Sequence, residues 1–136
     1  MNPKKIRNKC LNCNIEVKRI NAIYCCNRCQ HDYQYKQYII KWKSNEISGV
    51  TYNGSISGYI RRYLFEKYDY KCSKCNWLER NIITNTIPIE IDHIDGNSEN
   101  NNESNLRLLC PNCHSLTPTF RSLNNGNGRK NRRLRH

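Results

Sequence analysis

The sequence predicts a small α+β protein that zinc stabilises in place of a large hydrophobic core. The chain has 136 residues, of which only 37% are hydrophobic, and this is little apolar material for a core. It also contains nine cysteines, most of them in Cys-x2-Cys pairs. Such a pair forms a tight turn that presents two thiolates to one tetrahedral ion. Strand and helix patterns accompany the cysteines, so both kinds of secondary structure are expected.

Residues 1–30 are predicted to form an N-terminal zinc finger of the zinc-ribbon or treble-clef-like type. A first cysteine pair is followed, after roughly a dozen residues with alternating apolar side chains, by a second cysteine cluster. The five cysteines are Cys10, Cys13, Cys25, Cys26 and Cys29. They compete for four ligand positions, and either Cys25 or Cys26 can complete the site with Cys29. We prefer Cys25, because the segment resembles the Tyr-Cys-Ser-x2-Cys ending of many small fingers.

Residues 31–69 are predicted to form a helical connector. Between residues 30 and 43, aromatic and apolar side chains recur at spacings of three and four, which predicts a helix with one face in the core. The side chains on that face are Tyr35, Tyr38, Ile39 and Trp42. Residues 44–55 are rich in turn formers and are expected to form a loop. Ser57 then caps a second predicted helix that runs to about Tyr68.

Residues 70–120 are predicted to form a compact unit in the order strand, loop, strand, helix. The stretch 87–94 alternates apolar and polar residues as a strand does, and the polar residues 95–104 then form a loop. Residues 106–109 are expected to form the returning strand. A short helix begins within Cys-Pro-Asn-Cys-His at residues 110–114, and a proline shortly after it limits its length.

Two cysteine pairs bracket the chemically active residues of this unit. The pairs are Cys72 with Cys75, and Cys110 with Cys113. They are expected to close a second structural zinc site. Asp92, His93 and His114 lie between and directly after the pairs, so zinc coordination would bring these side chains together. Asp92 and His93 are neighbours on a predicted strand, and their side chains therefore diverge.

This combination of side chains suits the hydrolysis of a phosphodiester. The reaction requires a base that deprotonates water and a cation that stabilises charge on the phosphate and on the leaving oxygen. Histidine can serve as the base near neutral pH. One carboxylate with one imidazole suits a magnesium or manganese ion that keeps several of its waters.

The same residues carry a resemblance to a known family. Asp92, His93, Asn105 and His114, set in a strand, strand and helix unit between two Cys-x2-Cys pairs, resemble the motif of the HNH endonucleases of the ββα-metal superfamily. The run Cys-Pro-Asn-Cys-His-Ser that ends the motif resembles small phage-type HNH proteins in particular. The resemblance covers about residues 70–120 and implies a ββα-metal finger, with the N-terminal zinc finger as an accessory.

The resemblance implies a metal-dependent DNA endonuclease. His93 would be the general base. Asp92 and His114 would hold one catalytic Mg²⁺ or Mn²⁺ ion, in addition to the two structural zinc ions. Asn105 would hold the loop and backbone around the base. One site per chain implies that a monomer nicks one strand, in the manner of a phage homing or mobile-element nuclease. Glu90 and Asp95 could assist, but the motif does not require them.

The net charge of +12 indicates a polyanionic partner. Positive charge is concentrated in residues 1–30 and in residues 121–136, a basic tail that is too polar to pack alone and is expected to be disordered until it meets a polyanion. We expect double-stranded DNA as the partner, bound with sequence selectivity by a monomer or a weak dimer. Basic residues of the finger supply charge for this contact: Lys4, Lys5, Arg7, Lys9, Lys18, Arg19 and Arg28.

The expected location is the cytoplasm, which would be that of a bacterial host cell if a phage encodes the protein. The N-terminus lacks the apolar region of a secretory signal, and no stretch approaches the roughly 18 apolar residues of a membrane span. The alternative function is a non-enzymatic zinc-finger regulator that binds nucleic acid. Such a regulator needs the cysteines and the basic residues, but it has no use for Asp92, His93 and His114.

Overall fold

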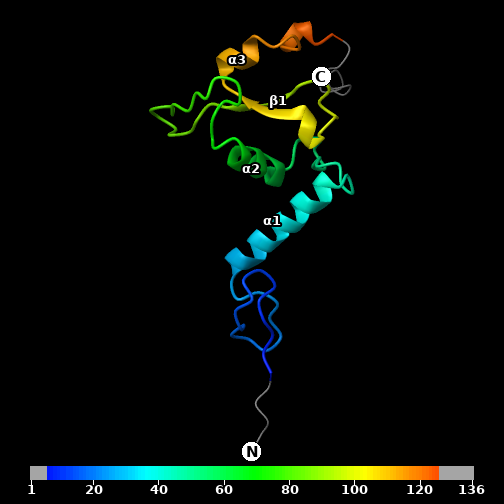
Figure 1. Ribbon diagram of the computed structural model, residues 1–136, viewed down its shortest axis with the longest axis vertical. Helices are drawn as coiled ribbons and strands as arrows, with labels where there is room; N and C mark the ends of the chain where they lie inside the picture. Colours follow the sequence, from blue (N-terminus) through cyan, green and yellow to red (C-terminus); the bar gives the residue numbers. More distant parts are fainter. Residues whose placement is uncertain (1–5, 126–136) are drawn as a thin grey trace, which may run out of the picture. The chain divides into compact units, whose positions relative to one another are not determined.

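The computed structural model describes residues 6–125 (Figure 1). The chain divides into two compact units, residues 1–41 and residues 42–136. Both helices and strands are present, so the protein is a small α+β protein as predicted. None of the helices within residues 6–125 has the length and hydrophobicity that a membrane span needs.

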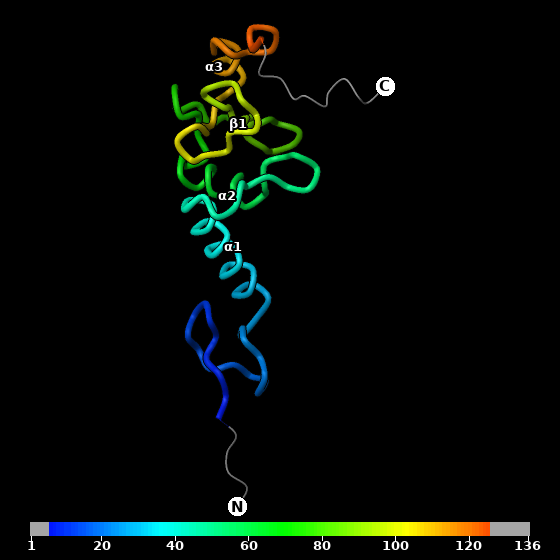
Figure 2. Tube along the Cα trace, turned by 90° about the vertical axis from the view of Figure 1, so that its right-hand side faces the viewer, coloured from blue at the N-terminus to red at the C-terminus, as the bar shows by residue number. Residues whose placement is uncertain are grey.

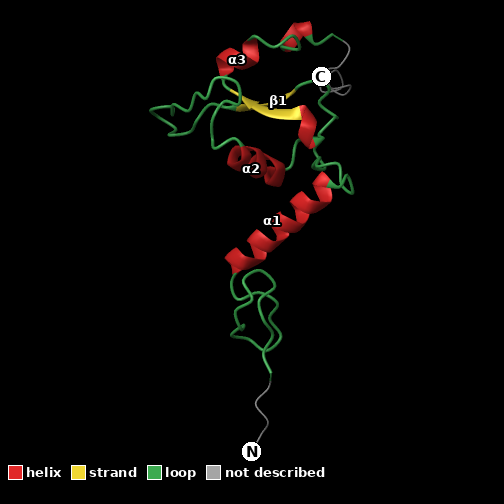
Figure 3. Cartoon of the chain, viewed as in Figure 1, coloured by secondary structure: helices red, strands yellow, loops and turns green. Residues whose placement is uncertain are grey.

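The first unit is an irregular cysteine-bearing segment followed by most of helix α1 (Asn27–Lys43), as Figure 3 shows. Its small core includes Cys10 and Val17, which are buried. Helix α1 begins earlier than the predicted start at residue 30. The reason is that the second cysteine cluster forms the first helical turn, in which the Gln30 amide donates to the Cys26 carbonyl over 3.2 Å.

Two cysteine turns, one in each unit, have the same backbone geometry. In each turn, the amide of the first cysteine donates to the carbonyl five residues later, over 2.8 Å at Cys10 and 2.9 Å at Cys72. The residue four positions after each of these cysteines is an asparagine, Asn14 or Asn76, and both have a φ of 62°. Asparagine tolerates this left-handed conformation better than most residues do. Asn14 and Asn76, which follow the first cysteine pair of each unit, therefore have a structural role.

The second unit contains a two-stranded antiparallel sheet that lies between two helices (Figure 1). Strand β1 (Glu90–His93) pairs with strand β2 (Leu106–Leu109). Helix α2 (Gly58–Lys67) contacts β2, and helix α3 (Pro111–Ser115) contacts both strands. Fully buried aliphatic side chains form the centre of this unit: Ile60, Leu64, Leu106, Leu108 and Leu109. The order of strand, loop, strand and helix agrees with the sequence prediction.

Helix α2 begins where the sequence predicted. The hydroxyl of Ser57 accepts a hydrogen bond from the Tyr59 amide over 3.2 Å, which satisfies one of the free donors at the helix N-terminus. Tyr68 is the C-cap, and its amide donates to the Leu64 carbonyl over 3.0 Å. The helix is thus fixed at both ends.

Strand β1 is shorter than the predicted strand 87–94. Pro88 has no amide hydrogen, and the amide of Ile89 donates back to the carbonyl of residue 87 over 2.8 Å instead of across the sheet. The partner strand sets the same limit, because Glu90 pairs with Leu109 and the chain after Leu109 enters α3. Pairing can therefore begin only at Glu90.

The loop between β1 and β2 (yellow in Figure 2) contains a short 3-10 helix, Glu103–Asn105, and a second 3-10 helix, Arg121–Leu123, follows α3. Residues 121–125 belong to the predicted tail, and Asn124 donates from Nδ2 to the Gly96 carbonyl over 2.7 Å. A Cβ at Gly96 would lie 2.4 Å from Asn124 Oδ1, so this contact requires glycine. The rest of the predicted tail, like Lys4 and Lys5, lies outside the described residues.

Candidate metal centres and active site

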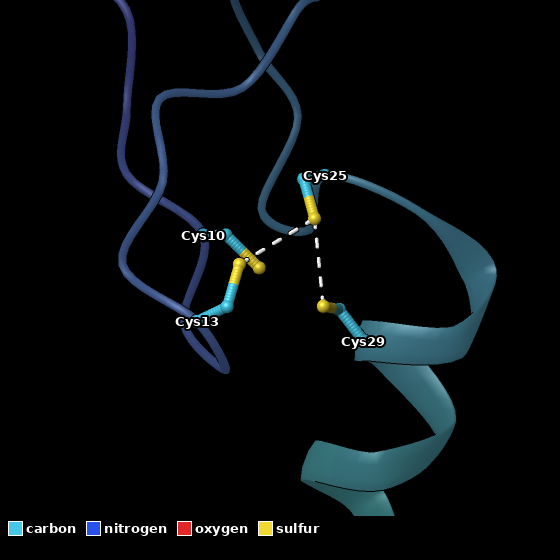
Figure 4. Close-up of side chains that lie close together, drawn as sticks. All are labelled: Cys10, Cys13, Cys25 and Cys29. Atoms are coloured by element: carbon cyan, nitrogen blue, oxygen red, sulfur yellow. Dashed lines mark hydrogen bonds between the residues drawn. The ribbon is translucent and has the colours of Figure 1, made fainter.

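Four thiols of the first unit point toward one another (Figure 4). The Sγ atoms of Cys10, Cys13, Cys25 and Cys29 all lie within 4.8 Å of one another. The distance from Cys13 to Cys25 is 3.6 Å, and that from Cys25 to Cys29 is 3.4 Å. Sulfur atoms on a tetrahedral zinc ion, with Zn–S bonds of about 2.3 Å, are about 3.8 Å apart, so the group fits zinc. The structure thus gathers Cys25, and leaves the exposed Cys26 outside the group.

A second group of four thiols lies beside the sheet. Its Sγ atoms also lie within 4.8 Å of one another, and the members are Cys72, Cys75, Cys110 and Cys113. Cys75 and Cys110 are 3.7 Å apart, which again fits a zinc ion. Leu109 and Trp77 pack against the group. This tetrad therefore connects the end of β2 and the start of α3 to the second cysteine turn.

The thiols of the second tetrad differ in their readiness to ionise. Burial raises the pKa of Cys72, but backbone amides of Cys110 and Cys75 outweigh it and lower this pKa to about 6. Burial and the neighbouring thiols raise the pKa of Cys113 to about 12. Zinc is bound by thiolates, so zinc binding must displace a proton from Cys113.

Asp92 and His114 come from different elements and face each other. Asp92 lies on β1 with only 5% of its side chain exposed, and its Oδ1 lies 3.6 Å from Nε2 of His114 on α3. Two ligands bound at about 2.1 Å to one octahedral ion are about 3.0 Å apart when adjacent and about 4.2 Å apart when opposite. The observed separation of 3.6 Å matches neither value but lies within the span that one ion can bridge, so the two side chains could hold a divalent ion after a small adjustment.

Each member of this pair has a charged partner that fixes its orientation. Arg107 stands opposite Asp92 in the sheet, and its Nε donates to Asp92 Oδ2 over 2.7 Å. Glu90 shares the Asp92 face of β1, and its Oε2 lies 2.6 Å from Nδ1 of His114. These contacts leave Asp92 Oδ1 and His114 Nε2 directed toward each other. Carboxylate partners of this kind commonly orient the histidine ligands of metal sites.

His93 leaves β1 on the opposite face from Asp92, as the alternation of a strand requires. Its Nε2 lies 2.9 Å from Oδ1 of Asn101, in the loop between the strands. Within residues 6–125, the structure joins Asp92 to His114, and joins His93 to this loop.

Asn105 fastens the two ends of the same loop. Its Nδ2 donates to Asp95 Oδ1 and to the carbonyl of Asn100, both over 2.8 Å, and its Oδ1 accepts from the Asp95 amide over 3.0 Å. Its carbonyl accepts from the amide of Ile94 over 2.9 Å. A hydrogen bond from Asn100 and others from the loop lower the pKa of the Asp95 carboxyl. The Asp95 carboxylate thus makes its hydrogen bonds within the loop and stabilises the loop conformation.

Three residues that contact the predicted site residues were not themselves predicted as part of the site. They differ in how far the sequence could have indicated them. Glu90 is two positions before Asp92, so it must share a strand face with Asp92. Arg107 becomes apparent once the register of the two strands is known. Asn101 is one of several asparagines in a polar loop, and nothing in the sequence distinguishes it from Asn100.

The structure thus contains two thiol tetrads that could each hold a structural zinc ion, and a carboxylate–histidine pair beside the small sheet. Comparison with known proteins gives a more specific result. The chain is 42% identical over 98 residues to the H-N-H endonuclease F-TflIV of Escherichia phage T5. The match covers 67% of this chain and 40% of the phage protein. No family model matches the chain, and no solved structure gives a significant match.

The name of the phage relative agrees with the family that the motif residues of the sequence resemble. The similarity supports the assignment of this chain to the HNH endonuclease family. The chain spans well under half of the length of the phage protein, so the comparison bears on a part of that protein.

Proposed function

We propose that the chain is a metal-dependent DNA endonuclease of the HNH type that hydrolyses phosphodiester bonds. One observation carries the proposal: Asp92 Oδ1 and His114 Nε2 face each other at 3.6 Å from two separate elements, each held in place by a charged partner. A protein that only binds nucleic acid through zinc fingers has no need of this arrangement. The name of the phage relative and the net charge of +12 support DNA as the substrate.

The metal ligand Asp92 and the general base His93 project from opposite faces of β1 and have different roles in the reaction. Asp92 and His114 hold a divalent ion, which when bound supplies positive charge to the phosphate and to the leaving oxygen. His93 takes the proton of the attacking water, and Asn105 keeps the loop beside His93 in shape. Attack then breaks the P–O3′ bond and leaves a 5′-phosphate and a 3′-hydroxyl. Because a chain carries one such site, each monomer nicks one strand, as suits a phage homing or mobile-element nuclease.

The test is nicking of supercoiled plasmid in the presence of magnesium or manganese. His93→Ala removes the base, and we expect the rate to fall on the order of 10²-fold or more, with zinc content and DNA affinity retained. His31→Ala is the matched control, because His31 is an exposed residue of α1 that takes no part in the site.

Two outcomes would count against the proposal. Nicking by His93→Ala at the wild-type rate would show that another group is the base. Wild-type protein that binds DNA but never cuts it, with either metal, would instead identify the non-enzymatic regulator.

A further inference from the structure

The hydrogen bond between His93 and Asn101 determines which ring nitrogen of His93 carries the proton. Asn101 presents its side-chain oxygen to His93 Nε2 at 2.9 Å. An amide oxygen only accepts hydrogen bonds, so Nε2 must be the donor. In a neutral imidazole the other nitrogen, Nδ1, then holds the lone pair. Only a nitrogen with a lone pair can take a proton from water.

Asn101 is itself held in a fixed position. The residue is buried, with 5% of its surface exposed, and its backbone carbonyl accepts a hydrogen bond of 2.8 Å from the indole Nε1 of Trp42. Trp42 is 3% exposed, and its ring packs edge-on against Tyr63 at 5.6 Å between centroids. The neighbouring carbonyl, that of Asn100, is bound by Asn105. The oxygen that faces His93 is therefore part of a packed, bonded segment.

The nearby carboxylate does not serve as this partner. Asp95 lies two residues after His93, but both of its oxygens are bound within the loop: Oδ1 accepts from Asn105 and the Asn97 amide, and Oδ2 accepts from Asn100 over 2.6 Å. A neutral amide partner keeps His93 oriented without the added pull of a negative charge on its proton.

We propose that Asn101 is a positioning residue for the nuclease reaction, which holds His93 with its proton on Nε2 and so leaves Nδ1 to accept the proton of the attacking water. This inference rests on the proposed function of His93. Trp42 supports the arrangement through the backbone of Asn101. Neither Asn101 nor Trp42 is proposed to touch the substrate.

The first measurement is independent of cleavage. The zinc-loaded full chain is labelled with ¹⁵N-histidine and examined by NMR without magnesium, and the His93 signals are identified among the four histidines with His93→Ala. We expect a slowly exchanging proton on Nε2 of His93. Asn101→Leu, which is similar in size but has no acceptor, should lose this slow proton, and Asn101→Asp, which keeps an acceptor oxygen, should retain it.

The second measurement is kinetic. Asn101→Leu should lower kcat for plasmid nicking on the order of tenfold to a hundredfold, with the dissociation constant for a linear duplex fragment unchanged. Asn101→Asp should recover most of the rate. Trp42→Phe keeps an aromatic ring but removes the N–H donor, and it should give an intermediate loss. Asn53→Leu, at an exposed loop position before α2, is the matched control.

The outcomes separate the two proposals. A wild-type His93 that carries its proton on Nδ1, or an Asn101→Leu variant with wild-type kcat, overturns the role of Asn101. Full activity of His93→Ala overturns the proposed function, and the NMR result still decides whether Asn101 binds Nε2. If Asn101→Leu fails to fold, the Trp42→Phe variant decides by the same two measurements.

Discussion

At the scale of single residues, each proposed reactive side chain has one dedicated partner. Arg107 binds Asp92, Glu90 binds His114, and Asn101 binds His93. Each of the first two contacts includes at least one charged group, which makes it stronger than a neutral hydrogen bond, and Asp92 is almost completely buried. Burial of an unpaired carboxylate would be costly, and Arg107 supplies the partner that the buried Asp92 side chain needs.

Glu90→Gln should weaken the proposed catalytic metal site. The change removes the charge that holds Nδ1 of His114, and loss of such a partner typically lowers metal affinity or activity by about 10- to 100-fold. The measurement is the manganese concentration that gives half-maximal nicking, which should rise for Glu90→Gln. Glu99→Gln, at an exposed position of the loop between the strands, is the control. An unchanged manganese requirement would show that Glu90 does not orient His114.

The sequence indicated which thiols come together, and that Asp92 and His114 meet, better than it indicated the partners of these side chains. The cysteines, Asp92 and His114 have fixed spacings because tetrahedral coordination and a strand, strand and helix order demand them. Asn101 is different, since its position depends on where the loop chain runs and on the indole of Trp42, 59 residues away in the sequence. Contacts of this kind arise from tertiary packing and leave no local pattern.

At the scale of elements, Glu103 joins the end of α2 to the loop that precedes β2. Its Oε1 accepts from Lys67 over 2.9 Å and from the Tyr63 hydroxyl, and it lies 3.7 Å from Lys43 Nζ. Burial raises the pKa of Glu103, but the bonds from Tyr63 and Lys67 outweigh it, so the pKa is lowered. One carboxylate therefore connects residues from α1, α2 and the 3-10 helix.

The lowered pKa of Glu103 predicts the direction of a pH effect. The unfolded chain protonates this carboxyl at a higher pH than the folded chain does, so the stabilisation is present above the unfolded pKa and is lost as the pH falls through the folded value. Glu103→Gln should therefore lower the melting temperature at pH 7, and the difference from wild type should shrink below about pH 4. Thermal unfolding followed by circular dichroism at a series of pH values measures this. A difference that stays constant down to pH 3 would contradict it.

The elements themselves were predictable where local chemistry determines them. The Ser57 cap and the 106–109 strand were correct, because capping and apolar pattern act within a few residues. The strand predicted for 87–94 was too long. Alternation of apolar residues continues through Ile87 and Ile89, but Pro88 and the length of the partner strand stop the pairing. An apolar pattern indicates which residues are able to pair, and the partner determines which of them do.

At the scale of the whole molecule, the two thiol tetrads lie in separate compact units. Each unit has few buried aliphatic residues, and in such small units a structural zinc ion supplies much of the folding free energy. Loss of one metal site should then affect the unit that contains it.

Replacing one cysteine in each unit tests this division. Cys25→Ser and Cys72→Ser should each reduce the zinc content from two ions per chain to one, and Cys26→Ser should leave it at two. Cys72→Ser should also abolish nicking, because the second tetrad holds β2 and α3 in place. Zinc released from the purified proteins and counted by a chelating dye gives the answer. Loss of both ions from either variant would show that the units do not fold independently.

The spacing of the cysteines sets an order in which the two units can form. Cys13 and Cys25 are 12 residues apart, whereas Cys75 and Cys110 are 35 residues apart. The entropy lost when a flexible chain is closed into a ring grows with the logarithm of its length, and here it disfavours the longer ring by about 1 kcal/mol. This difference in chain entropy, taken by itself, favours the filling of the N-terminal site at a lower zinc concentration. In a cell short of zinc, the chain would keep its N-terminal finger after it had lost the unit proposed to cut DNA.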